Sequence, residues 1–140
     1  MPNIIHATGI IFENPQGEIL VLKRHPSQPE GNTWGLVGGK VSSDETSVQT
    51  AVKKCLAETG FSLDIKKLIF IKKYHLLIDN QDIEFDVYKY PITENFDVNI
   101  DPVGSTEYAW QKPEYLIQQS NLMTGLYPII KDHYINTSGL

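Results

Sequence analysis

The residues best suited to bind phosphate surround a glycine turn in the first third of the chain. Arg24, the only arginine, closes a predicted strand, and Lys40 directly follows Gly38 and Gly39. A guanidinium presents a planar fork of donors that matches phosphate oxygens, and an ammonium meets phosphate as a point charge. Trp34, just before the turn, carries a ring on which a nucleobase could stack. These residue types indicate a phosphorylated small molecule, although Arg24 could equally be a surface charge at a strand end.

Two carboxylates follow the turn. Glu45 lies at the start of a predicted helix and Glu58 near its end. Ser42 and Glu45 have the S-x-x-E spacing of a capping box, in which each side chain bonds the other residue's backbone N–H, and this would explain Glu45 without a chemical role. Glu58 could likewise be a solvated residue bridged to Lys54 four positions earlier. Each carboxylate therefore has a structural interpretation beside a chemical one.

The helix that must position these carboxylates is predicted over 44–59. Gly60 is suited to end it, because glycine accepts the left-handed conformation that closes many helices. The single cysteine, Cys55, lies on the apolar face, so we expect it to be buried and inert rather than a nucleophile. The apolar stripe at helical spacing consists of Val48, Val52, Cys55 and Leu56.

Strand patterns flank this helix. Residues 4–12 and 18–24 are apolar and β-branched, and the N-P-Q-G segment between them predicts a hairpin turn. A strand is predicted over 82–90, where Ile83, Phe85 and Val87 alternate with three acidic residues, which indicates one buried and one wet face. The sum is an α/β fold with a mixed β-sheet and a few helices. The other predicted elements are a loop at 25–35, strands at 67–77 and 107–112, a helical turn at 113–116 and a helix within 122–134.

Length and composition limit the class of protein. The chain has 140 residues, 12 basic against 17 acidic, and a formal charge of −5, which fits a single domain over 1–140. The acidic balance argues against a general DNA binder or a polybasic membrane-surface protein. One cysteine forms no internal disulfide, and neither a signal-peptide pattern nor a membrane-length apolar run is present. We therefore expect a soluble, cytoplasmic, single-domain protein.

The segment from Trp34 to Phe61 resembles the Nudix box, G-x5-E-x7-R-E-U-x-E-E-x-G-U with U aliphatic. Gly39 fits the first glycine, Glu45 follows after five residues, and K-K-C-L-A-E-T-G-F completes the frame at Phe61. The preceding W-G-L-V-G-G-K is similar to the family's W-x-x-P-G-G-K, with valine in place of proline. Typical family features also follow downstream, E-Y-A-W at 107–110 and P-E at 113–114. The resemblance therefore covers roughly the whole chain.

The resemblance implies an α/β/α sandwich that hydrolyses the pyrophosphate bond of a nucleotide derivative with Mg²⁺ or Mn²⁺. It implies metal contacts from the Glu58 carboxylate and the Gly38 carbonyl, and catalytic candidates Glu58, Glu45 and Glu107. It further implies a substrate contact from Arg24, to which Lys40 and Trp34 are added as candidates because they lie beside the predicted glycine turn. Lys54 is a fourth substrate candidate, because an ammonium can meet a phosphate. Since Nudix-like folds are often dimeric, the resemblance also favours a homodimer.

The chain departs from the family on the helix face that would hold the metal. Three glutamates there would bring −3, whereas Lys54, Ala57 and Glu58 bring +1, 0 and −1. A divalent cation beside an ammonium meets repulsion, and Mg²⁺ requires oxygen ligands. Two hypotheses follow. One is a divergent Nudix hydrolase of a nucleoside di- or triphosphate derivative, with weakly bound or absent metal. The other is a catalytically silent Nudix domain that binds a nucleotide or a protein as a sensor or adaptor.

Overall fold

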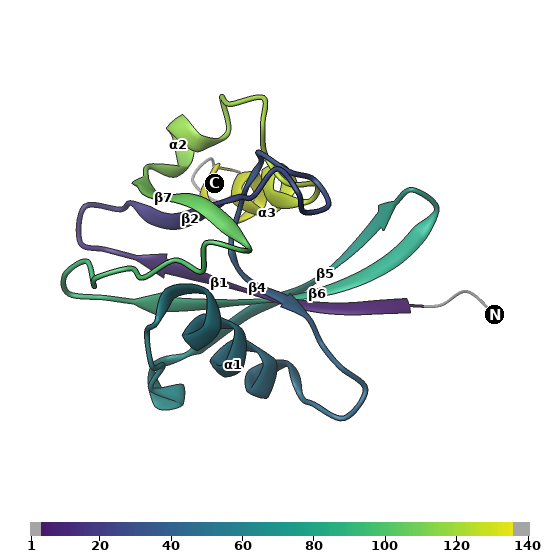
Figure 1. Ribbon diagram of the computed structural model, residues 1–140, viewed down its shortest axis with the longest axis horizontal. Helices are drawn as coiled ribbons and strands as arrows, with labels where there is room; N and C mark the ends of the chain where they lie inside the picture. Colours follow the sequence, from purple (N-terminus) through teal and green to yellow (C-terminus); the bar gives the residue numbers. More distant parts are fainter. Residues whose placement is uncertain (1–3, 136–140) are drawn as a thin grey trace.

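The structure, a computed structural model, describes residues 4–135 and has a mixed β-sheet between helices (Figure 1). The strands are β1 (Ile4–Glu13), β2 (Ile19–Arg24), β3 (Trp34–Gly35), β4 (Val37–Lys40), β5 (Ile69–Ile78), β6 (Gln81–Pro91) and β7 (Ser105–Gln111). The helices are α1 (Ser47–Thr59), η1 (Ile65–Lys67), α2 (Pro113–Leu116), α3 (Leu126–Ile130) and η2 (Lys131–Ile135). No helix among residues 4–135 is long and apolar enough to cross a membrane.

Strand β1 is the centre of the sheet. It pairs in parallel with β6 along its whole length, from Ile4 opposite Asp82 to Glu13 opposite Pro91. It also pairs antiparallel with β4 and, at the predicted hairpin, with β2. The hairpin turn is held by Asn14, whose side-chain oxygen accepts the backbone N–H of Glu18 over 2.9 Å. The outer strands are β5 beside β6, and β3 and β7 beside β2.

The two faces of the sheet are covered by different helices, α1 on one side and α2 with α3 on the other (Figure 1). Successive side chains of β1 alternate between these layers, as a strand requires. Ile10 and Phe12 pack with Ala51 and Cys55 of α1, whereas Ile11 packs with residues of α2 and α3. The predicted α/β/α sandwich around a mixed sheet is confirmed.

The start of the predicted helix was wrong by three residues. Helix α1 begins at Ser47, and its capping box is formed by Thr46 and Gln49 rather than by Ser42 and Glu45. The Thr46 hydroxyl accepts the Gln49 N–H over 3.1 Å, and the Gln49 side chain accepts the Thr46 N–H over 2.9 Å. Both segments have suitable spacing, so the local pattern alone did not distinguish them. Gly60 ends the helix in the left-handed conformation, as predicted.

Two further predictions needed correction. The strand β4 was missed, and Trp34 and Gly35 of the predicted loop form β3. Glycines in β4 carry weak strand propensity, so its place comes from the pairing with β1. The alternation in β6 is correct, but its acidic face is partly buried, and Asp86 there pairs with Lys73 over 3.1 Å.

Candidate functional site

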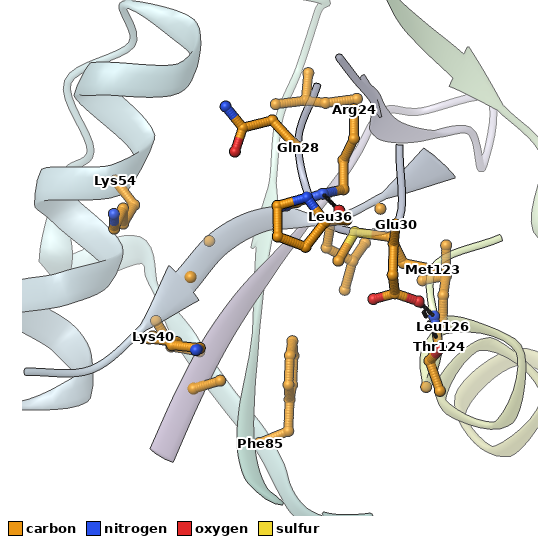
Figure 2. Close-up of a pocket in the computed structure, with 18 of the residues that line it drawn as sticks. Arg24, Gln28, Glu30, Leu36, Lys40, Lys54, Phe85, Met123, Thr124 and Leu126 are labelled. Atoms are coloured by element: carbon orange, nitrogen blue, oxygen red, sulfur yellow. Dashed lines mark hydrogen bonds between the residues drawn. The ribbon is translucent and has the colours of Figure 1, made fainter. Parts of the chain in front are cut away.

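A cavity of about 700 Å³ opens between α1, the sheet and α3 (Figure 2). Part of its lining is apolar and includes Leu36, Phe85 and Met123. Its other part is charged, with Arg24 from the end of β2, Lys40 from the end of β4, and Lys54 and Glu58 from α1. A site with a charged part and an apolar part suits a ligand that carries both kinds of group.

The predicted turn at Gly38 and Gly39 is instead part of strand β4, where the two glycines pair with Gly9 and Thr8 of β1. Gly38 has φ of +152°, and a Cβ there would lie 2.0 Å from the Thr8 carbonyl oxygen. Only glycine permits this approach, since the obstacle is backbone. Gly39 differs, because a Cβ there would meet the Lys54 side chain at 3.1 Å. The two glycines thus serve different purposes, strand pairing at Gly38 and room for Lys54 at Gly39.

Strand β4 and helix α1 are joined by a hydrogen bond from the Gly38 N–H to Oε1 of Glu58, over 3.0 Å. The structure therefore brings these two candidate residues together, and Gly38 contributes its amide to this contact. Burial raises the pKa of Glu58 to about 7, and the nearby Asp101 carboxylate adds to this effect. The Gly38 N–H, Lys54 and Arg24 act in the opposite direction but do not overcome burial. Glu58 can therefore exchange a proton near neutral pH.

The residues at this face do not fit the divalent metal that the resemblance implies. Of the three positions expected to hold it, Lys54 and Ala57 line the cavity without a carboxylate. Within residues 4–135, no group of three or more His, Cys, Asp or Glu side chains could hold a metal ion. The other cavity carboxylates are engaged as well, since Asp101 accepts the Val103 N–H over 3.0 Å and Glu30 accepts the Thr124 N–H over 2.9 Å. Mg²⁺ would lack the oxygen shell it requires.

The cations of the cavity are not neutralised by ion pairs. Arg24, Lys40 and Lys54 have no described carboxylate within salt-bridge distance. The Arg24 Nε donates to the Pro29 carbonyl over 2.7 Å, and this bond holds the guanidinium at the cavity wall. Three cations that line one cavity favour an anionic ligand. All three were predicted as substrate contacts.

Three predicted site residues do not line the cavity. Glu45 accepts hydrogen bonds from Thr50 over 2.9 Å and from Lys53 over 3.2 Å. The pKa of Glu45 is lowered, mainly by the Thr50 hydrogen bond. Glu107 on β7 pairs with Lys23 over 3.4 Å. These carboxylates therefore have structural partners outside the cavity.

Trp34 is also outside the cavity, although its neighbours Gly35 and Leu36 line it. Its side chain is only 8% exposed and belongs to the core cluster that includes Leu116 and Ile130. A ring packed in this way has no free face for a nucleobase. The proximity of Trp34 to the turn in sequence did not reveal which way the strand would direct the ring.

Sequence reasoning missed Glu30, Asp101 and Phe85 as cavity residues. Glu30 has a positive φ of 54° and ties the segment 25–33 to the segment before α3 through Thr124. No motif marks Glu30, and Asp101 is marked only by the turn-forming D-P-V-G sequence. Phe85 was correctly assigned to the buried face of its strand, where it lines the cavity beside Leu36 (Figure 2).

Solved structures share this fold across most of the chain. The MutT protein from Methanosarcina mazei has a TM-score of 0.80 and 19% identity, covering 94% of this chain and 93% of its own. A Caenorhabditis elegans Ap4A hydrolase has a TM-score of 0.73 and 15% identity, covering 97% of this chain and 99% of its own.

A third similar structure contains a bound ligand. It is the NUDIX domain of Shewanella oneidensis NrtR complexed with ADP ribose, with a TM-score of 0.76 and 15% identity, covering 94% of this chain and 86% of that one. At these identities the likeness shows the fold. The family model described as NUDIX domain matches residues 4–132. With that match over nearly the whole chain, the protein belongs to the Nudix family.

Proposed function

We propose that the cavity binds a nucleoside di- or triphosphate derivative. The observation that carries this proposal is that Arg24, Lys40 and Lys54, all without ion-pair partners in the described chain, line the same cavity. Phosphates would lie against these cations, and the nucleoside against the apolar wall at Phe85 and Leu36. The ligand class is supported by two neighbours, one an Ap4A hydrolase and one bound to ADP ribose.

We propose further that the chain is a divergent hydrolase with weakened activity. Water would add to a phosphorus atom, the bond from phosphorus to the bridging oxygen would break, and the departing phosphate would take that electron pair and a proton. Glu58 is suited to hold the proton from water, because its pKa is near 7. Arg24 and Lys54 would stabilise negative charge on the phosphate oxygens.

The proposed hydrolysis depends little on the divalent metal that the family uses. Nudix hydrolases generally use a divalent metal, which neutralises phosphate charge. Here the carboxylates of positions 54 and 57 are absent, and the described residues form no metal cluster. We therefore expect Mg²⁺ or Mn²⁺ to bind weakly or not at all.

A catalytically silent nucleotide-binding domain is the second candidate. One observation favours it. Among the described residues of α1, Glu58 is the one carboxylate that lines the cavity, and its Oε1 already accepts the Gly38 N–H. A domain with an intact cavity and little turnover would serve as a sensor or adaptor.

The two candidates differ in turnover. The test presents ADP-ribose, diadenosine tetraphosphate and nucleoside triphosphates to the protein with Mg²⁺, Mn²⁺ or EDTA, and measures both melting temperature and product release. Stabilisation with slow release supports the divergent hydrolase, and stabilisation without release supports the silent domain. The absence of any melting shift or product with all ligands would contradict the proposed ligand class.

A further inference from the structure

The ammonium of Lys54 belongs, with that of Lys40, to the lysines that line the cavity. It lies on α1 at the cavity, four residues before Glu58, and has no salt bridge or hydrogen bond to a residue of the described chain. Its neighbour Lys53 instead pairs with Glu45 over 3.2 Å, outside the cavity. Salt bridges to carboxylates are also made by Lys23, Lys72, Lys73 and Lys89. An unpaired cation at a cavity wall is available to an anion.

Gly39 of strand β4 leaves room for the Lys54 side chain. A Cβ on Gly39 would lie 3.1 Å from Cε of Lys54 and 3.4 Å from its Cδ. The lysine stem therefore packs over Gly39, where the glycine has no side chain. Figure 2 shows Lys54 reaching from the helix and Lys40 from the adjacent strand. The packing of the stem limits where the ammonium can move, which lowers the entropy lost on binding.

The carboxylates that line the cavity are engaged with the backbone and do not supply a competing metal site. Glu58, Asp101 and Glu30 each accept a backbone N–H, from Gly38, Val103 and Thr124. The positive charge that an anion would meet therefore comes from Arg24, Lys40 and Lys54, because the described residues form no metal cluster. Arg24 faces the same carboxylate, Glu58, that Lys54 does.

We propose that the Lys54 ammonium binds a phosphate of the ligand directly and supplies charge that a divalent metal supplies in relatives with a complete box, so that binding is independent of metal. This inference rests on the proposed function, since it concerns the same ligand class. It predicts that the free anion binds at least as tightly as its magnesium complex, because Mg²⁺ neutralises the charge that Lys54 recognises.

The test measures the Kd of ADP and of inorganic pyrophosphate by calorimetry, in EDTA and in Mg²⁺. We expect the wild-type protein to bind in EDTA at least as tightly as in Mg²⁺. Lys54→Met keeps the stem over Gly39 and removes the charge, so binding in EDTA should weaken by about tenfold, the scale of one charged hydrogen bond. Lys54→Arg should retain most of the affinity, and Lys66→Ala on the exposed helix η1 is the control for net charge.

Melting curves of each variant establish that it is folded. Binding that requires Mg²⁺, or binding in EDTA that Lys54→Met leaves unchanged, overturns this inference while the proposed function stands. An equal loss of affinity in Lys66→Ala also overturns it, because only net charge would then matter. If neither probe binds in either buffer, this inference and the proposed function both fail.

Discussion

The backbone N–H of Gly38 donates a hydrogen bond to Oε1 of Glu58 over 3.0 Å, although the two residues are twenty positions apart. This bond joins strand β4 to the last turn of helix α1. It also places a partly buried carboxyl beside the cations of the cavity. The stability of strand β4 at Gly38 and the protonation of Glu58 are therefore coupled.

The two glycines should respond differently to alanine. Gly38→Ala sets a Cβ 2.0 Å from the Thr8 carbonyl oxygen, so strand β4 must move away from β1. We expect a loss of about 3 kcal/mol or more in the free energy of unfolding. Gly39→Ala meets only the flexible Lys54 side chain at 3.1 Å, and should cost less than about 1 kcal/mol. Urea unfolding measures both, and similar costs for the two variants would contradict this assignment.

The stability of the protein should depend on the protonation of Glu58. Its pKa is 4.5 when unperturbed and about 7 in the folded protein, so between these pH values the folded state holds a proton that the unfolded state releases. The free energy of unfolding therefore falls as pH rises through this range. Glu58→Gln removes this dependence and keeps an oxygen for the Gly38 N–H. We expect it to stabilise the protein by about 1–2 kcal/mol at pH 8 and to have little effect near pH 4. Destabilisation at pH 8 would contradict the burial argument.

Restoring the missing carboxylates should restore metal dependence. Lys54→Glu with Ala57→Glu changes the summed charge at positions 54, 57 and 58 from 0 to −3. We expect Mg²⁺-dependent hydrolysis of a nucleotide substrate to rise by at least about tenfold over the parent. The measurement is phosphate or nucleotide release with Mg²⁺ and with EDTA, with Lys66→Glu and wild type as controls. A double variant as inactive as the parent would show that more than these carboxylates is missing.

The apolar wall should be sensitive to Gly9. A Cβ at Gly9 would lie 2.7 Å from Cε1 of Phe85, so the ring must move within the cavity while the strand pairing can stay intact. We expect Gly9→Ala to remain folded and to weaken nucleotide binding by about threefold or more, with a smaller effect on pyrophosphate. Calorimetry with ADP and pyrophosphate compares the two. An equal effect on both probes would contradict a nucleoside at Phe85.

Cys55 should be unreactive in the folded protein. Its side chain is fully buried on α1, and burial raises the pKa of the thiol to about 11. A thiol that is both inaccessible and protonated is a poor nucleophile. A chromogenic disulfide reagent at pH 8 should label Cys55 fully in denaturant and only slowly without it. Immediate stoichiometric labelling of the folded protein would contradict this expectation.

Patterns within one element were read well from the sequence. The predicted stripe on α1 was correct for Cys55, which is buried, but wrong for Leu56, which is 53% exposed, because the buried face runs through Thr50, Ala51, Cys55 and Thr59. Gly60 ends that helix, as predicted. The alternation at Ile83, Phe85 and Val87 gave the correct face of β6. These features follow from periods of 3.6 and 2 residues, which depend on local geometry alone. The capping-box prediction failed because two segments with suitable spacing, 42–45 and 46–49, follow one another there.

The sequence by itself determined the family frame, the sandwich of helices around a mixed sheet, and the absence of carboxylates at positions 54 and 57. Only the tertiary structure decided which side chains share the cavity. It turned Trp34 into the core, paired Glu107 with Lys23, and left Lys54 without a carboxylate partner in the described chain. The reason is physical: these outcomes depend on pairing between segments far apart, such as β1 with β6, and no local period encodes that register.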